Sequence, residues 1–226
     1  MSNSEQLLQD GYIHFPGAVP ADLLDRCIAE INTNPDERWD WEGPLADEFR
    51  SWFRTFMDYT ELSIWGESSL NVFNRHEGGY MWWHSDGAGG NPAYGRRVFC
   101  CVYMTPTYGG GGLKVVPGSH IGAAFDKLKA RQAEFIADPI HQMIQDPANP
   151  DSMIHNPEKG NLLPLMYPDL HPDLCHIDGE VTLEVPAGTV VIADERIWHS
   201  VAVNKRQNRR VMVMWWRWKP IIGENG

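Results

Sequence analysis

The sequence predicts a mostly β protein of the jelly-roll type, a sandwich or barrel, with flanking N-terminal helices and one long insertion. From residue 70 onward, short runs rich in β-branched and aromatic residues follow one another, among them SLNVFNR, RVFCCVYMT and TVVIAD. Glycine and proline turns such as Gly78-Gly79 and Pro117-Gly118 separate these runs. Several short strands with such turns are typical of a sandwich or barrel.

The segment before the predicted strands supplies the helices. Residues 11–17, GYIHFPG, predict a short strand that ends at Pro16-Gly17. The run PADLLDRCIAEIN predicts a helix that starts near Pro20, because its apolar residues recur at helical spacing. Residues 45–58 predict a second amphipathic helix. We expect both helices to pack against the sheet as scaffold.

The insertion lies between the central strands. IGAAFDKLKARQAEFIA predicts one helix, and the rest of residues 121–179 is rich in proline and has no hydrophobic period. Loops of this length are usually functional lids or disordered insertions. Because no shift in composition marks a boundary, we expect a single domain over residues 1–226, with residues 121–179 as lid or insertion.

Composition indicates which partners are excluded and in which compartment the protein is expected. Nineteen basic and thirty acidic residues give a net charge of −11, a poor match for nucleic acid or an anionic membrane. No apolar run approaches the ~20 residues that span a bilayer. The N-terminal residues have no basic and no apolar stretch, so we expect no secretory signal. The four cysteines form no CxxC, and adjacent Cys100 and Cys101 would face opposite sides of a strand. We expect buried thiols in a cytoplasmic protein.

One constellation of residues carries chemistry. In Trp82-Trp83-His84-Ser85-Asp86, the side chains of His84 and Asp86 would share one face of a strand. His199 follows the strand TVVIAD far downstream. Two histidines and one carboxylate are the facial triad that holds Fe(II) and leaves positions open. The alternatives are a chance HxD pair and a hydrogen-bonded histidine at a strand end.

Two arginines, Arg209 and Arg210, open the last strand. A guanidinium inside a barrel needs a partner, which a dicarboxylate bound to the metal would supply. We expect Arg210 to point inward with Met212 and Met214, and Arg209 to point to solvent, since neighbouring residues of a strand face opposite ways. A surface position on an edge strand is the alternative for either.

Four of these segments together resemble the phytanoyl-CoA dioxygenase-like family of Fe(II)/2-oxoglutarate-dependent oxygenases. They are HSD at 84–86, GGLKVVPGSH at 111–120, PAGTVVIADERIWHS at 186–200, and Arg210. The resemblance covers roughly residues 10–31, 70–120 and 180–218, and it implies a double-stranded β-helix, a cupin-like jelly roll.

The resemblance also assigns roles to residues. It implies that His84, Asp86 and His199 are iron ligands and catalytic residues, and that Arg210 pairs with the distal carboxylate of 2-oxoglutarate. Asn71 and Tyr103 match positions that contact or flank this cosubstrate. One departure is Val201, which stands where many members have a small hydroxyl residue.

The implied activity is that of a dioxygenase of the hydroxylase type. With Fe(II), 2-oxoglutarate and O2, it would oxidise, most simply hydroxylate, a C–H bond of a small molecule and release succinate and CO2. One alternative is a cupin-type metal enzyme such as an isomerase. The presence of Arg210 and the lack of an HxH pair argue against this alternative. Another is a non-catalytic β-barrel binding module. Arg75, Arg96 and Arg97 would anchor an acidic substrate or lie on the surface.

Overall fold

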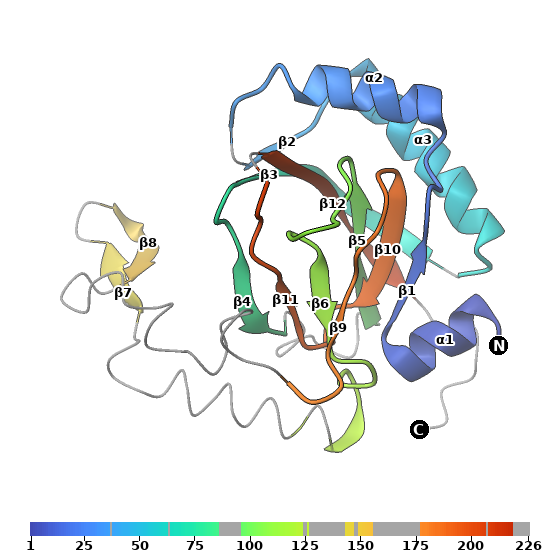
Figure 1. Cartoon of the computed structure of the whole chain (residues 1–226), viewed down its shortest axis with the longest axis vertical. Coiled ribbons are helices and arrows are strands. Elements are labelled where there is room, and N and C mark those ends of the chain that lie inside the picture. Colours follow the sequence, from blue (N-terminus) through green and yellow to red (C-terminus); the bar gives the residue numbers. More distant parts are fainter. Residues whose placement is uncertain are drawn as a thin grey trace.

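Two antiparallel β-sheets face each other, and helices cover the outer side of the larger sheet (Figure 1). The computed structural model describes residues 1–36, 38–62, 64–85, 96–123, 126, 143–146, 149–155, 177–206 and 208–218. The larger sheet has the order β1 (Tyr12–Phe15), β10 (Thr189–Asp194), β5 (Arg96–Tyr103), β12 (Asn208–Trp218), β3 (Ile64–His76) and β2 (Arg38–Asp40). The smaller sheet has the order β4 (Met81–His84), β11 (His199–Val201), β6 (Leu113–Val115) and β9 (Val181–Thr182). The predicted jelly-roll fold is confirmed.

The six-stranded sheet is apolar on both faces and therefore separates two cores. On β5, Val98, Cys100 and Val102 pack toward the helices. The residues between and after them, Phe99, Cys101 and Tyr103, pack toward the smaller sheet. On β10, Val191 and Ala193 also face the smaller sheet. A strand buried on both sides reads as a continuous apolar run, as VFCCVY and TVVIAD do. The predicted opposite orientation of Cys100 and Cys101 is confirmed.

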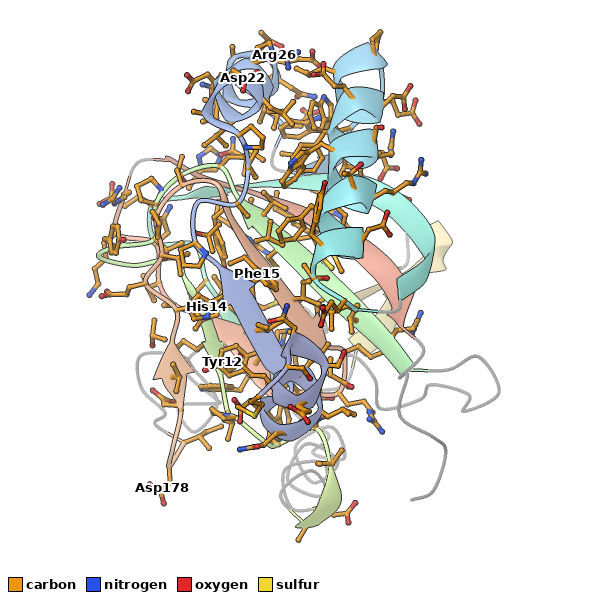
Figure 2. All side chains as sticks on the ribbon, turned by 90° about the vertical axis from the view of Figure 1, so that its right-hand side faces the viewer. Tyr12, His14, Phe15, Asp22, Arg26 and Asp178 are labelled. Carbon is orange, nitrogen blue, oxygen red and sulfur yellow. The ribbon has the colours of Figure 1, made fainter. Side chains whose placement is uncertain are left out.

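The two predicted helices are α2 (Ala21–Ile31) and α3 (Pro44–Tyr59), which lie side by side over the larger sheet (Figure 2). Each buries residues four apart on one face, as Phe49, Phe53 and Met57 of α3 do. Pro44 stands in the first turn of α3, where its missing N–H costs no hydrogen bond. These helices close the core on the outer side of the sheet, so the other side holds the cavity described below.

Several elements were not predicted. Helix α1 (Asn3–Asp10) begins with a capping box between Ser2 and Glu5 and ends at Gly11, whose φ of 79° suits glycine. The short strand β2 and the hairpin of β7 (Met143–Asp146) and β8 (Asn149–His155) were also missed. The helix expected at the start of the insertion lies mostly outside the described residues.

None of the helices in the described part of the chain is both long enough and apolar enough to cross a membrane.

Candidate metal centre

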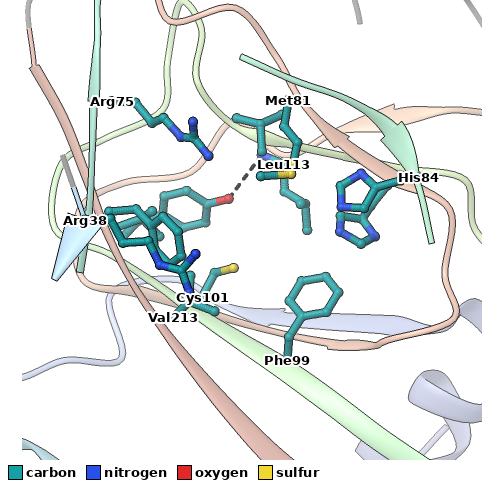
Figure 3. Close-up of a pocket in the computed structure, with 13 residues that line it drawn as sticks. Arg38, Arg75, Met81, His84, Phe99, Cys101, Leu113 and Val213 are labelled. Carbon is teal, nitrogen blue, oxygen red and sulfur yellow. Dashed lines mark hydrogen bonds between the residues drawn. The ribbon is translucent and has the colours of Figure 1, made fainter. Parts of the chain in front are cut away.

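Two of the three predicted metal ligands, His84 and His199, lie next to each other on the cavity side of the smaller sheet (Figure 3). His84 ends β4 and His199 begins β11, and the two residues are direct partners in the antiparallel pairing. Their ring centroids are 4.2 Å apart. Residues about 115 positions apart in the chain thus present two imidazoles to one point, as a shared metal ion requires.

The His199 ring is held in one orientation by the backbone. Its Nδ1 lies 2.9 Å from the carbonyl oxygen of Ile197. A carbonyl only accepts, so this hydrogen bond requires the proton on Nδ1 and leaves the lone pair on Nε2, the usual tautomer of a metal ligand. The Phe99 ring packs against the imidazole with 4.8 Å between centroids. His199 is buried, so its position is fixed by packing as well.

Two hydrogen bonds hold the segment before His199 in place, and one of them connects it to the segment of His84. The Ser85 hydroxyl donates to the carbonyl oxygen of Arg196 over 3.0 Å. The backbone N–H of Trp198 donates to the Ser119 hydroxyl over 2.9 Å, within the buried core. The first bond holds the end of β4 against the turn that leads into β11, and the second holds that turn against the loop after β6.

The third predicted ligand, Asp86, lies outside the described residues, as does the following loop to residue 95. Within the described ranges, no group of three His, Cys, Asp or Glu side chains could hold a metal ion. The structure therefore brings together His84 and His199, and the carboxylate ligand stays a prediction.

The histidine pair forms part of the wall of a cavity of about 220 Å³ between the sheets (Figure 3). Most of its wall is aliphatic or aromatic, and its charged side chains are Arg38 and Arg75. The lining residues are Arg38, Phe73, Arg75, Met81, His84, Phe99, Cys101, Tyr103, Leu113, His199, Val201, Val211 and Val213. An apolar cavity with a few polar groups is the usual form of a small-molecule site.

Of the two predicted cosubstrate contacts with described side chains, Tyr103 lines the cavity and Asn71 does not. Tyr103 is 1% exposed, and its hydroxyl accepts a hydrogen bond from the backbone N–H of Leu113 over 3.1 Å. Asn71 lies on β3 two residues before Phe73, opposite Val213, and its Nδ2 donates to the carbonyl of Ser69. Asn71 thus belongs to the same face of β3 as Phe73, but it lies outside the cavity wall. The roles of both residues stay predictions.

The two backbone positions that open β12, 209 and 210, belong to opposite faces of the strand. Arg209 is the register partner of Arg75 on β3, and Arg75 lines the cavity, as do Val211 and Val213 further along β12. Because alternate residues share a face, position 209 belongs to the cavity face and position 210 to the face toward the helices. This register disagrees with the expected inward position of Arg210. The side chains of both arginines lie outside the described part, so their contacts stay predictions.

Val201, which stands where many family members have a small hydroxyl residue, makes part of the cavity wall apolar. Val201 lines the cavity two residues after His199, so the wall at this point is apolar. Ser200 is fully buried on the other face of β11, and its hydroxyl has no hydrogen-bond partner among the described residues. Ser200 therefore does not replace the hydroxyl that Val201 lacks.

Sequence reasoning missed several residues of the cavity wall. Phe99 and Cys101 alternate with Tyr103 on β5, so the period of the strand contained the signal for them. Arg38 stands on a three-residue strand that no pattern indicated. Cys100, on the opposite face, is fully buried, and this burial raises the pKa of its thiol well above the ordinary value. Cys100 is therefore an uncharged core residue.

Comparison with protein families gives a match that covers most of the chain. The sequence model of the phytanoyl-CoA dioxygenase (PhyH) family matches residues 40–212. No curated protein sequence matches the chain.

Solved structures with the same fold share little sequence with this chain. HygX from Streptomyces hygroscopicus with iron bound is 12% identical, covers 94% of this chain and 85% of its own, and has a TM-score of 0.63. SnoN, a non-heme alpha ketoglutarate dependent epimerase from nogalamycin biosynthesis, is 14% identical, with coverages of 94% and 80% and a TM-score of 0.61. EvdO2 from Micromonospora carbonacea var. aurantiaca, complexed with 2-oxoglutarate, is 16% identical, with coverages of 99% and 92% and a TM-score of 0.57.

Proposed function

Because the chain belongs to the phytanoyl-CoA dioxygenase (PhyH) family, we propose that it is an Fe(II)- and 2-oxoglutarate-dependent dioxygenase of the hydroxylase type. In the proposed reaction, a substrate C–H bond, O2 and 2-oxoglutarate give a C–OH group, succinate and CO2. The observation that carries the proposal is the pair of imidazoles, His84 and His199, with ring centroids 4.2 Å apart in the wall of an apolar cavity.

The donor set fits iron. Two neutral imidazoles with a carboxylate form the facial set of non-heme Fe(II) oxygenases. The Nδ1 hydrogen bond of His199 leaves its Nε2 lone pair for the metal, and Asp86 follows His84 by two residues, as the third ligand would. When bound, Fe(II) with 2-oxoglutarate and O2 supplies the oxidising power for the C–H bond, which no side chain here could supply.

The residues of this chain would bind, orient and shield the reactants. His84 and His199 hold the metal, and the Ile197 carbonyl keeps the second imidazole in the ligating tautomer. Phe99 and Met81 form apolar wall beside the histidines, which excludes water from the reacting centre. The protein thus contributes geometry and a dry cavity.

The distal carboxylate of 2-oxoglutarate needs a cation deep in the cavity. Spacing from His199 supports Arg210, whereas the β12 register supports position 209, because its partner Arg75 lines the cavity. Register determines which face of the strand a residue belongs to, whereas spacing along the chain does not. We therefore assign the bidentate carboxylate contact to Arg209. Tyr103, which lines the same cavity, would flank the chain of the cosubstrate.

Oxidative epimerisation is the second candidate, because the fold also resembles that of SnoN, an epimerase. The mass of the product separates the two reactions. Hydroxylation adds one oxygen atom to the substrate, whereas epimerisation leaves its mass unchanged. A small-molecule substrate agrees with the cavity. A reducing cytoplasmic location, which rests on the buried thiols of Cys27 and Cys100, stays a prediction.

The proposed function is tested by metal content and succinate release. The protein loaded with Fe(II) without oxygen should hold one iron per chain. After O2 is admitted with ascorbate as the reductant, it should convert 2-oxoglutarate to succinate without added substrate, at a slow uncoupled rate. H84A, D86A and H199A should each lose the iron and the succinate while keeping their circular dichroism. H14A is the matched control, because His14 is an exposed histidine on β1. Full iron and succinate in H84A would disprove the assignment.

A further inference from the structure

The end of the cavity away from the histidines is positively charged. Arg38 and Arg75 lie across the cavity from His84 in Figure 3. They are the only arginines or lysines among its thirteen described lining residues, and none of the thirteen is Asp or Glu. The whole chain, in contrast, has a net charge of −11. A concave site lined by one sign of charge attracts the opposite sign, so this end selects for an anion.

Both guanidinium groups lie near one aromatic ring. The Cζ atom of Arg38 is 4.9 Å from the centroid of the Phe73 ring, and that of Arg75 is 5.9 Å from it. Arg38 on β2 is the register partner of Phe73 on β3, and Arg75 follows two residues later on the same face. A guanidinium held over a ring presents its N–H donors at its edge, the geometry that a carboxylate oxygen pair accepts.

The backbone beneath Arg75 is fixed. Asn204 is 1% exposed, and its Nδ2 donates to the carbonyl oxygens of Arg75 over 2.9 Å and His76 over 3.2 Å. The Asn204 backbone also exchanges hydrogen bonds with Gly78 and Gly79 in the turn after β3. The end of β3 is therefore anchored before any ligand arrives, which lowers the ordering cost of binding.

We propose that Arg38 and Arg75 form a carboxylate-binding subsite at the end of the cavity opposite the histidines. The placement of a metal at the other end rests on the proposed function. The cavity of about 220 Å³ is smaller than the roughly 300 Å³ at which sites for drug-sized ligands begin, so the subsite suits a small acid. This carboxylate belongs either to 2-oxoglutarate, in addition to the β12 arginine, or to the substrate.

The first arm of the test compares two ligands that differ only at the distal end. Calorimetry on the Ni(II)-loaded protein measures the Kd of 2-oxoglutarate and of 2-oxopentanoate, which has the same five carbons and 2-oxo acid but no second carboxylate. If the subsite takes the cosubstrate, R38Q and R75Q should weaken 2-oxoglutarate binding at least tenfold and change 2-oxopentanoate binding less than twofold. R54Q is the control, because Arg54 is an exposed arginine on α3.

The second arm identifies a substrate carboxylate. Pentanoate is titrated into Ni(II)-loaded protein that is already saturated with 2-oxoglutarate. If the subsite serves the substrate, wild type should bind pentanoate, R38Q should weaken this binding at least tenfold, and 2-oxoglutarate affinity should not change. Arg38 is exposed, so R38Q keeps the test valid even if R75Q fails to fold.

The subsite is disproved if R38Q changes neither the affinity for 2-oxoglutarate in the first arm nor the affinity for pentanoate in the second. Failure of the proposed function looks different: wild type would bind neither Ni(II) nor 2-oxoglutarate. In that case, glutarate titrated into the metal-free protein should still bind more weakly to R38Q than to wild type, and equal binding would overturn the subsite.

Discussion

The hydroxyl of Ser85 donates to the backbone carbonyl of Arg196 over 3.0 Å and connects the two segments that carry the histidine pair. Ser85 directly follows His84, and Arg196 precedes His199 by three residues. This one bond spans 111 positions of the chain. The middle residue of the HSD motif thus has a structural task of its own, which is to hold the end of β4 against the turn before β11.

Replacing Ser85 should loosen the metal site. In S85A the hydrogen bond to Arg196 is lost, which should cost about 1 kcal/mol of stability. Partners that bond directly to a metal ligand are worth about 10–100-fold in metal affinity, and Ser85 acts one step further away, so a loss of about three- to tenfold is expected. Titration of Ni(II) into the metal-free protein measures it. S4A, which also removes a serine bond to a backbone carbonyl, is the control and should bind metal as wild type does. Equal affinity in S85A would mean that the bond does not position the histidines.

Tyr103 should contribute to stability through its hydroxyl. In Y103F, the buried backbone N–H of Leu113 loses its acceptor. An unsatisfied buried donor costs about 1–3 kcal/mol, so the free energy of unfolding should fall by that amount. Urea unfolding measures the change. Y59F, at a tyrosine that is 81% exposed, should leave the free energy unchanged, and a Y103F protein as stable as wild type would contradict the assigned bond.

The two arginines at the start of β12 should differ in their effect on 2-oxoglutarate. R209Q changes the β12 position whose register partner, Arg75, lines the cavity, whereas R210Q changes the next position, which belongs to the opposite face. A charge-assisted bidentate pair is worth about 2–4 kcal/mol, so R209Q should raise the 2-oxoglutarate concentration needed for succinate formation by roughly 30-fold or more. R210Q should change it little. The reverse result would restore Arg210 as the partner.

Alkaline pH should destabilise the protein through Cys27. Burial raises the pKa of this thiol to about 12 from an ordinary value of 9.0. The folded state therefore holds the proton more tightly than the unfolded chain, and the stability present below pH 9 is lost as pH rises toward 12. Wild type should lose about 1 kcal/mol more than C27A between pH 7 and pH 10, as measured by urea unfolding. An equal loss in both proteins would contradict the raised pKa.

Much of the fold could be predicted because its signals are local. The helical spacing of Phe49, Phe53 and Met57 and the turn glycines between strands each depend on neighbouring residues. The histidine pair was also accessible, because HSD and IWHS each place a histidine at the end of a predicted strand. In contrast, β2 is three residues long, and nothing in RWD indicates a strand.

The face of β12 could not be predicted, because the sheet is apolar on both sides. Val211 and Met212 are equally suited to a core, so alternation separates the two faces without telling which one meets the cavity. Register resolves the ambiguity: Met212 pairs with Val72, a residue of the helix-side core, and Val211 pairs with Phe73, which lines the cavity. Register depends on long-range pairing, which local patterns do not contain.

A crystal structure with Ni(II) and 2-oxoglutarate would show the metal site itself. We expect one metal ion bound by the Nε2 atoms of His84 and His199 and by Asp86, with the 2-oxo acid end of the cosubstrate on the metal and its distal carboxylate in the cavity lined by Tyr103 and Phe73. A metal ion bound elsewhere, or 2-oxoglutarate outside this cavity, would disprove the proposed site.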